Sequence, residues 1–160
     1  MSIQSGDRIP EVNLKRIRDG GVETVDTRTL FDGKKVLLFS VPGAFTPTCS
    51  ERHLPGFVER YADFRARGIE VLCMSVNDPF VMKAWGEAHQ VPQGFEMLAD
   101  GNGDFARALG LEMDATAYGM GTRSKRFALY AEDGVVKQLH VEAPGEFRVS
   151  AADYVLEQLG

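Results

Sequence analysis

Residues 35–50 read KVLLFSVPGAFTPTCS, and this stretch predicts a buried strand that turns into a helix. The run VLLFSV is continuous, apolar and partly β-branched, as in a strand buried on both faces. Pro42-Gly43 follows it as a turn signal. A helix is then expected to begin at Thr46–Thr48 and to run towards Arg67, with Pro55 as an internal kink or a lost hydrogen bond.

Strands and helices alternate through most of the chain. Hairpin turns are expected at Asp19-Gly20-Gly21 and Asp133-Gly134, and Ser150, with Asp153 three residues on, is expected to cap the last helix. The expected strands are 11–14, 22–25, 35–41, 69–76, 95–99, 127–131 and 135–141, and the expected helices are 46–67, 80–89, 104–109 and 154–159.

This order of elements predicts the fold class. Alternating βαβ units imply parallel strands, and the closing hairpin adds antiparallel ones. The sequence therefore predicts a thioredoxin-like α/β fold, with a central mixed sheet and helices on both faces. The chain has 160 residues and no repeat, low-complexity tract or linker, so 1–160 is expected to form one domain.

Composition and charge exclude several classes of protein. The net charge is −5 and the basic residues are scattered, so neither nucleic acid nor an anionic membrane is expected as a partner. The longest apolar run is too short to span a bilayer, and the first 14 residues lack the pattern of a secretory signal peptide. Only two cysteines are present, Cys49 and Cys73, which excludes a disulfide-rich scaffold and predicts a reducing, cytoplasmic location.

Cys49 is the strongest candidate for a reactive residue. It falls in the first turn of the expected helix, where unpaired backbone N–H groups and the helix dipole favour a negative charge. Such a setting lowers the pKa of a thiol and raises the fraction of nucleophilic thiolate. The alternative is a buried, inert cysteine, because free cysteine is among the most buried residue types.

Several segments together resemble one known family. The segment PGAFTPTC (42–49) is similar to the peroxidatic motif of peroxiredoxins, and with HLPGF (53–57) it resembles the peroxiredoxin-five and plant type II subfamily. The resemblance covers nearly the whole chain, since it continues through SVNDPFVMKAW (75–85), RSKRFAL (123–129) and GEF (145–147).

The resemblance implies an activity and a pocket. The activity is thiol-dependent reduction of hydrogen peroxide and small organic hydroperoxides through a sulfenic acid, with glutathione, glutaredoxin or thioredoxin as the reductant. The pocket residues are Pro42, Thr46, Cys49 and Arg126. On residue chemistry alone, Thr46 could be a helix cap, Pro42 a turn residue and Arg126 a solvated charge. Arg123 is the alternative arginine.

Other residues leave alternatives open. His53, four residues after Cys49, could form a cysteine-hydrolase pair or half a zinc site, but a local hydrogen-bonding role is favoured. The glycine-rich segment 100–104 is expected to be a turn and helix cap, and no metal, haem, flavin or nicotinamide motif is present. Phe45, Phe80 and Trp85 could lie in the core or in a homodimer contact, and a homodimer is expected.

Two rival functions and the role of Cys73 also stay open. A non-enzymatic redox sensor or holdase could use the same fold, whereas a thioredoxin-type oxidoreductase is disfavoured because Thr46 stands where its first cysteine would be. Cys73 lies in an apolar strand, which favours a structural thiol over a resolving one. Plant type II members imply a resolving role there, so Cys73 remains a possible resolving residue.

Overall fold

The strand predicted from VLLFSV is β3 (Lys35–Val41), which lies well inside a seven-stranded sheet in the computed structural model of residues 2–160. Its parallel neighbour is β4 (Ile69–Ser75), and its antiparallel neighbour is β8 (Phe127–Glu132). In spatial order the sheet runs β2 (Gly21–Asp26), β1 (Asn13–Arg18), β5 (Glu96–Ala99), β4, β3, β8 and β9 (Val135–Val141). The predicted mixed sheet is therefore confirmed.

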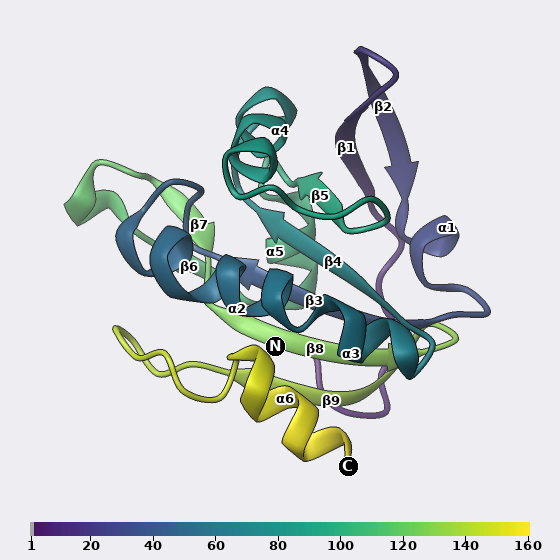
Figure 1. Ribbon diagram of the computed structural model, residues 1–160. Helices are drawn as coiled ribbons and strands as arrows, with labels where there is room; N and C mark the ends of the chain where they lie inside the picture. The colour runs from purple at the N-terminus through teal and green to yellow at the C-terminus, as the bar shows by residue number, and fades with distance from the viewer. Residues whose placement is uncertain (1) are drawn as a thin grey trace.

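Helices cover both faces of this sheet (Figure 1). One face packs against α1 (Thr27–Phe31) and α5 (Asp104–Leu109). The other face packs against α2 (Leu54–Glu59), α3 (Tyr61–Ala66), α4 (Pro79–Ala88) and α6 (Ala152–Leu159). Alternate residues of β3 enter the two cores, with Leu38 on one side and Leu37 and Phe39 on the other. The α/β fold with helices on both faces is thus as predicted.

The helix after β3 is less regular than predicted. It opens with a π-helical turn, η1 (Cys49–His53), continues as α2, and is interrupted at Arg60 before α3. In η1 the N–H of Leu54 donates to the carbonyl of Cys49, five residues back. Pro55 accounts for the wider turn, because in a regular α-helix its ring would collide with the carbonyl of Glu51.

Some elements differ from the predictions for local reasons. The helix α1 and a two-stranded sheet of β6 (Glu112–Asp114) and β7 (Thr122–Ser124), joined through the 3₁₀ turn η2 (Thr116–Tyr118), were not predicted, because all are too short to show a period. Ser150 was wrongly predicted to cap α6. The N-cap is Ala151, and the Ser150 hydroxyl donates to Glu142 instead. Across residues 2–160, none of the helices has the length and apolar character needed to cross a membrane.

Candidate active site

The end of β3 delivers Cys49 to the carboxyl edge of the sheet. The chain leaves the strand through Pro42 and Gly43. The helical segment that follows, η1, begins with Cys49, whose side chain has no exposed surface. Gly43 leaves room for its neighbours, since an added Cβ would lie 2.9 Å from the Cε atom of Met120 and would require that side chain to shift. The predicted location of Cys49 at a strand-to-helix junction is confirmed, and the residue is buried there.

Arg126 contacts the sulfur directly. It immediately precedes β8, whose first residue pairs with Ser40 near the end of β3, so antiparallel pairing brings it to the same edge as Cys49. One terminal guanidinium nitrogen, Nη2, lies 3.1 Å from Cys49 Sγ. A fixed positive charge at this distance stabilises a thiolate relative to a thiol.

Arg123, the alternative arginine, is engaged elsewhere. Its Nε donates to the carbonyl of Met120 at 2.9 Å, and its Nη1 donates to the carbonyl of Pro42 at 3.4 Å. Arg123, which lies on β7, therefore ties the loop before β7 to the turn after β3, whereas Arg126 lies at the sulfur.

His53 lies behind Arg126 and is fully buried. Its Nδ1 is 2.9 Å from Arg126 Nη1, and its Nε2 is 3.0 Å from the carbonyl of Ser150. Because a guanidinium only donates and a carbonyl only accepts, the ring is neutral, with its proton on Nε2. Burial and then the charge of Arg126 lower the pKa of His53 to about 3, against the opposing effect of the Ser150 carbonyl. His53 is thus a local hydrogen-bonding residue.

Thr46 and Pro42 lie in the turn between β3 and Cys49, and both are half-buried. The Thr46 hydroxyl donates to the carbonyl of Gly43 at 2.7 Å. Within residues 2–160, no hydrogen bond joins this hydroxyl to the Cys49 sulfur. With its proton committed to Gly43, the Thr46 oxygen is left as an acceptor for a peroxide O–H group.

Neighbouring side chains hold the active-site turn in place. Asn77 accepts a 3.0 Å hydrogen bond from the N–H of Ala44, and the Trp85 indole donates to the Ser50 hydroxyl at 2.9 Å. Trp85 is completely buried, so it belongs to the core. Phe45 is 54% exposed and Phe80 is 65% exposed.

The ring of Phe147 packs against His53 and Arg126. The sequence alone indicated no role for this side chain. Its centroid lies 5.0 Å from that of the His53 ring and 5.8 Å from the Arg126 Cζ atom. Glu142 and the Ser150 carbonyl, which support His53, were also missed. A backbone carbonyl carries no signal in sequence, and Glu142 is far from Cys49 along the chain.

Cys73 lies on β4 in the same apolar cluster as Cys49. Both cysteines are free thiols. Burial, and then the proximity of Cys49, raise the pKa of Cys73 well above its ordinary value. Cys73 is therefore mainly protonated at neutral pH and is a poor nucleophile in this conformation.

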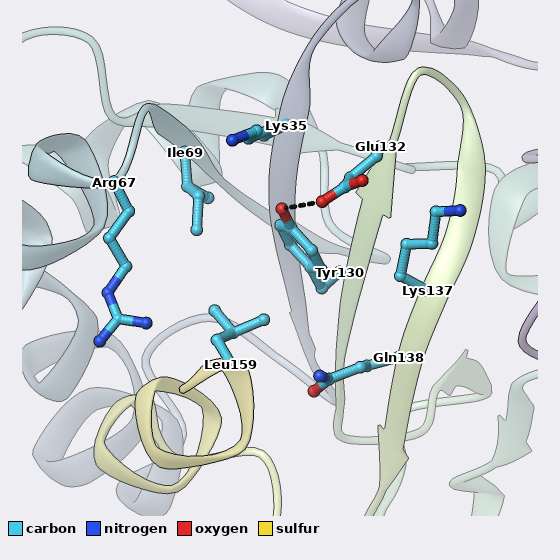
Figure 2. A pocket seen from close by; sticks show the side chains of 8 residues that line it. All are labelled: Lys35, Arg67, Ile69, Tyr130, Glu132, Lys137, Gln138 and Leu159. Carbon is cyan, nitrogen blue, oxygen red and sulfur yellow. Dashed lines mark hydrogen bonds between the residues drawn. The ribbon is translucent and has the colours of Figure 1, made fainter.

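The hollow drawn in Figure 2 is not part of this site. Its volume is about 450 Å³, and it lies beside Lys35 and Ile69, which begin β3 and β4, and Glu132, which ends β8. Cys49 and Arg126 lie at the opposite edge of the same strands. The hollow is therefore at the other end of these strands from the sulfur and takes no part in chemistry at Cys49.

The chain is similar to known proteins over nearly its whole length. The Redoxin family model matches residues 4–156. The chain is 45% identical to peroxiredoxin-2B of Arabidopsis thaliana, over 98% of both chains. It superposes with a TM-score of 0.94 on reduced Prx3 of Vibrio vulnificus in complex with hydrogen peroxide, at 47% identity over 99% of both chains. It superposes with a TM-score of 0.88 on a 1-Cys peroxiredoxin, the antioxidant protein of Plasmodium falciparum, at 29% identity over 98% of both. The chain belongs to the Redoxin family and, within it, is a peroxiredoxin similar to the plant type II members.

Proposed function

We propose that this peroxiredoxin reduces hydrogen peroxide and small alkyl hydroperoxides with Cys49 as the nucleophile. The observation that carries the proposal is the 3.1 Å contact between the Arg126 guanidinium and Cys49 Sγ. As a peroxiredoxin the chain is a thiol peroxidase and an oxidoreductase. The residue roles below belong to the proposal and are supported by the geometry of the site.

In the first step the Cys49 thiolate attacks one peroxide oxygen. The S–O bond forms as the O–O bond breaks, the sulfur is oxidised to sulfenic acid, and the other oxygen takes up a proton and leaves as water or an alcohol. Arg126 stabilises the charge that moves from sulfur to the leaving oxygen. Thr46 accepts a hydrogen bond from the peroxide, and Pro42 keeps bulk water from the sulfur.

A thiol reductant then completes the cycle. One thiol condenses with the sulfenic acid to give a mixed disulfide and water, and a second thiol releases Cys49. Glutathione, with or without glutaredoxin, is the proposed reductant, and thioredoxin is the alternative. Because the Cys73 thiol is buried and its pKa is raised, Cys73 is assigned a structural role.

A homodimer and a cytoplasmic location complete the proposal. Phe45 and Phe80 are large apolar side chains that are more than half exposed, and an interface between two copies would bury them. Phe45 also has a φ of 67°, a conformation that costs a non-glycine residue energy and holds the ring outward. The two free thiols fit a reducing compartment such as the cytoplasm.

The decisive experiment measures peroxide consumption with excess glutathione and glutaredoxin. Wild type is expected to consume many equivalents of hydrogen peroxide, Cys49→Ser none, and Cys73→Ala nearly as many as wild type. Intact-mass spectrometry should show one added oxygen on Cys49 after one equivalent of peroxide. If wild type instead consumes one equivalent and stops with every thiol reductant, the chain acts as a redox sensor.

A further inference from the structure

A buried carboxylate, Glu142, organises the loop between β9 and α6. Its Oε2 atom accepts hydrogen bonds from the Arg148 N–H at 2.7 Å, the Ser150 N–H at 2.8 Å and the Ser150 hydroxyl at 2.6 Å. Burial alone would raise the pKa of Glu142, but these hydrogen bonds hold the pKa below its ordinary value. The carboxylate is therefore charged at neutral pH, and its hydrogen bonds are stronger than those of a neutral acceptor.

These bonds lead to the catalytic sulfur through an unbroken chain. The Ser150 carbonyl accepts from His53 Nε2 at 3.0 Å, and His53 Nδ1 accepts from Arg126 Nη1 at 2.9 Å. The other guanidinium nitrogen, Nη2, lies 3.1 Å from Cys49 Sγ.

Glu142 also fixes Arg126 from a second side. The backbone N–H of Glu142 donates to the carbonyl of Arg126 at 3.0 Å, at the point where β8 and β9 meet. The side chain of Glu142 thus fixes the loop that supports His53, while its backbone fixes the residue that His53 orients. Phe147, against both His53 and Arg126, belongs to the same loop.

We propose that Glu142 is a positioning residue for the peroxide step, acting through Ser150 and His53 to aim Arg126 at Cys49. The inference rests on the proposed roles of Cys49 and Arg126. The loop from residue 142 to residue 151 contains no helix or strand, so regular backbone hydrogen bonds do not hold it in place. The hydrogen bonds of the Glu142 carboxylate hold it instead. Without Glu142, the Ser150 carbonyl loses its fixed place, and the His53 ring and the guanidinium gain freedom to turn.

The test compares Glu142→Ala with Glu146→Ala, which removes an exposed glutamate from the same loop. Single-turnover oxidation by hydrogen peroxide can be followed by the fluorescence of Trp85, the only tryptophan. Glu142→Ala is expected to slow oxidation about tenfold and to slow the alkylation of Cys49 by iodoacetamide at pH 7, because a misplaced guanidinium interacts less with the sulfur. Glu146→Ala is expected to match wild type in both measurements.

A second background separates positioning from general destabilisation. In Arg126→Gln, the further change Glu142→Ala should leave the oxidation rate unchanged, because the group through which Glu142 acts is gone. A wild-type rate for Glu142→Ala, or an equal slowing in both backgrounds, would overturn the inference. If Glu142→Ala does not fold, Glu142→Gln decides: about threefold slower oxidation together with slower alkylation supports the proposal, and wild-type values refute it. Full activity of Cys49→Ser or Arg126→Gln would instead refute the proposed function itself.

Discussion

Arg126 donates a 2.9 Å hydrogen bond to Nδ1 of His53, so an uncharged imidazole lies directly against a guanidinium. Within residues 2–160 no carboxylate forms an ion pair with Arg126. No neighbouring negative charge therefore offsets the positive charge that Arg126 presents to Cys49 Sγ. A carboxylate in place of His53 would orient the guanidinium equally well but would compensate its charge. A neutral acceptor orients Arg126 and leaves its field available to Cys49.

The buried, neutral His53 predicts a pH dependence of stability. Its pKa is about 3 in the folded protein and about 6.5 in an unfolded chain, so the unfolded state binds the proton first as the pH falls. The stabilisation is complete above pH ~6.5 and is lost progressively towards pH ~3, with a slope of about 1.4 kcal/mol per pH unit in that range. His53→Gln should lack this component. Urea unfolding of both proteins between pH 3 and 8 measures it, and parallel curves would contradict the assignment.

The two arginines near the turn should differ sharply in function. Arg126→Gln removes the positive charge at the sulfur and is expected to slow Cys49 oxidation about 10²–10³-fold, as does loss of a donor that stabilises developing charge. Arg123→Gln loses only loop contacts to Met120 and Pro42, and its oxidation rate should fall less than about tenfold. Stopped-flow oxidation by hydrogen peroxide measures both rates, and a larger loss in Arg123→Gln would exchange the two roles.

The Thr46 hydroxyl is expected to matter more than its methyl group. Thr46→Val removes the hydroxyl donor of the Gly43 carbonyl, which keeps only the 3.3 Å hydrogen bond from the Thr46 N–H, and it removes the acceptor offered to peroxide, so kcat/KM for hydrogen peroxide should fall about tenfold or more. Thr46→Ser keeps the hydroxyl and should retain most of the activity. Equal activity of the valine and serine variants would show that the hydroxyl has no part in catalysis.

The exposed aromatic rings predict the state of association. Phe80→Glu places a charge in the proposed apolar interface and should shift the protein to monomer in sedimentation velocity at micromolar concentration. Val22→Glu is the matched control, because Val22 is an exposed apolar residue on β2, away from the site. A monomeric wild type, or an equal shift in the control, would rule out an interface at Phe80.

The larger elements were predictable because their patterns are long. The apolar run of β3, the Asp133-Gly134 turn and the Asp78-Pro79 start of α4 each combine a period with a turn or cap signal, and all three formed as expected. The π-helical turn was predictable only as an irregularity near Pro55. Ser150 has the sequence of a helix cap, but a distant carboxylate, Glu142, accepts from its hydroxyl, and tertiary contacts of this kind have no local signature.

The site was predictable to the extent that its residues follow a motif. Cys49 and the choice of Arg126 over Arg123 agree with the geometry, because strand pairing brings the start of β8 beside the end of β3. The support behind Arg126 was not predictable in the same way. It depends on the carbonyl of Ser150 and on the buried side chains of His53 and Glu142, whose positions follow from the path of the loop after β9.

Cys49 and Arg126 lie 77 positions apart along the chain, and this separation has a consequence for protein synthesis. When Cys49 leaves the ribosome, the arginine that contacts it in the folded protein has not been translated, and the contact requires β8 to dock beside β3. Until then the thiol lacks its positive neighbour and reacts as an ordinary cysteine. The positive neighbour of Cys49 is therefore a product of folding: it is absent from the nascent chain and present only once β8 has paired with β3.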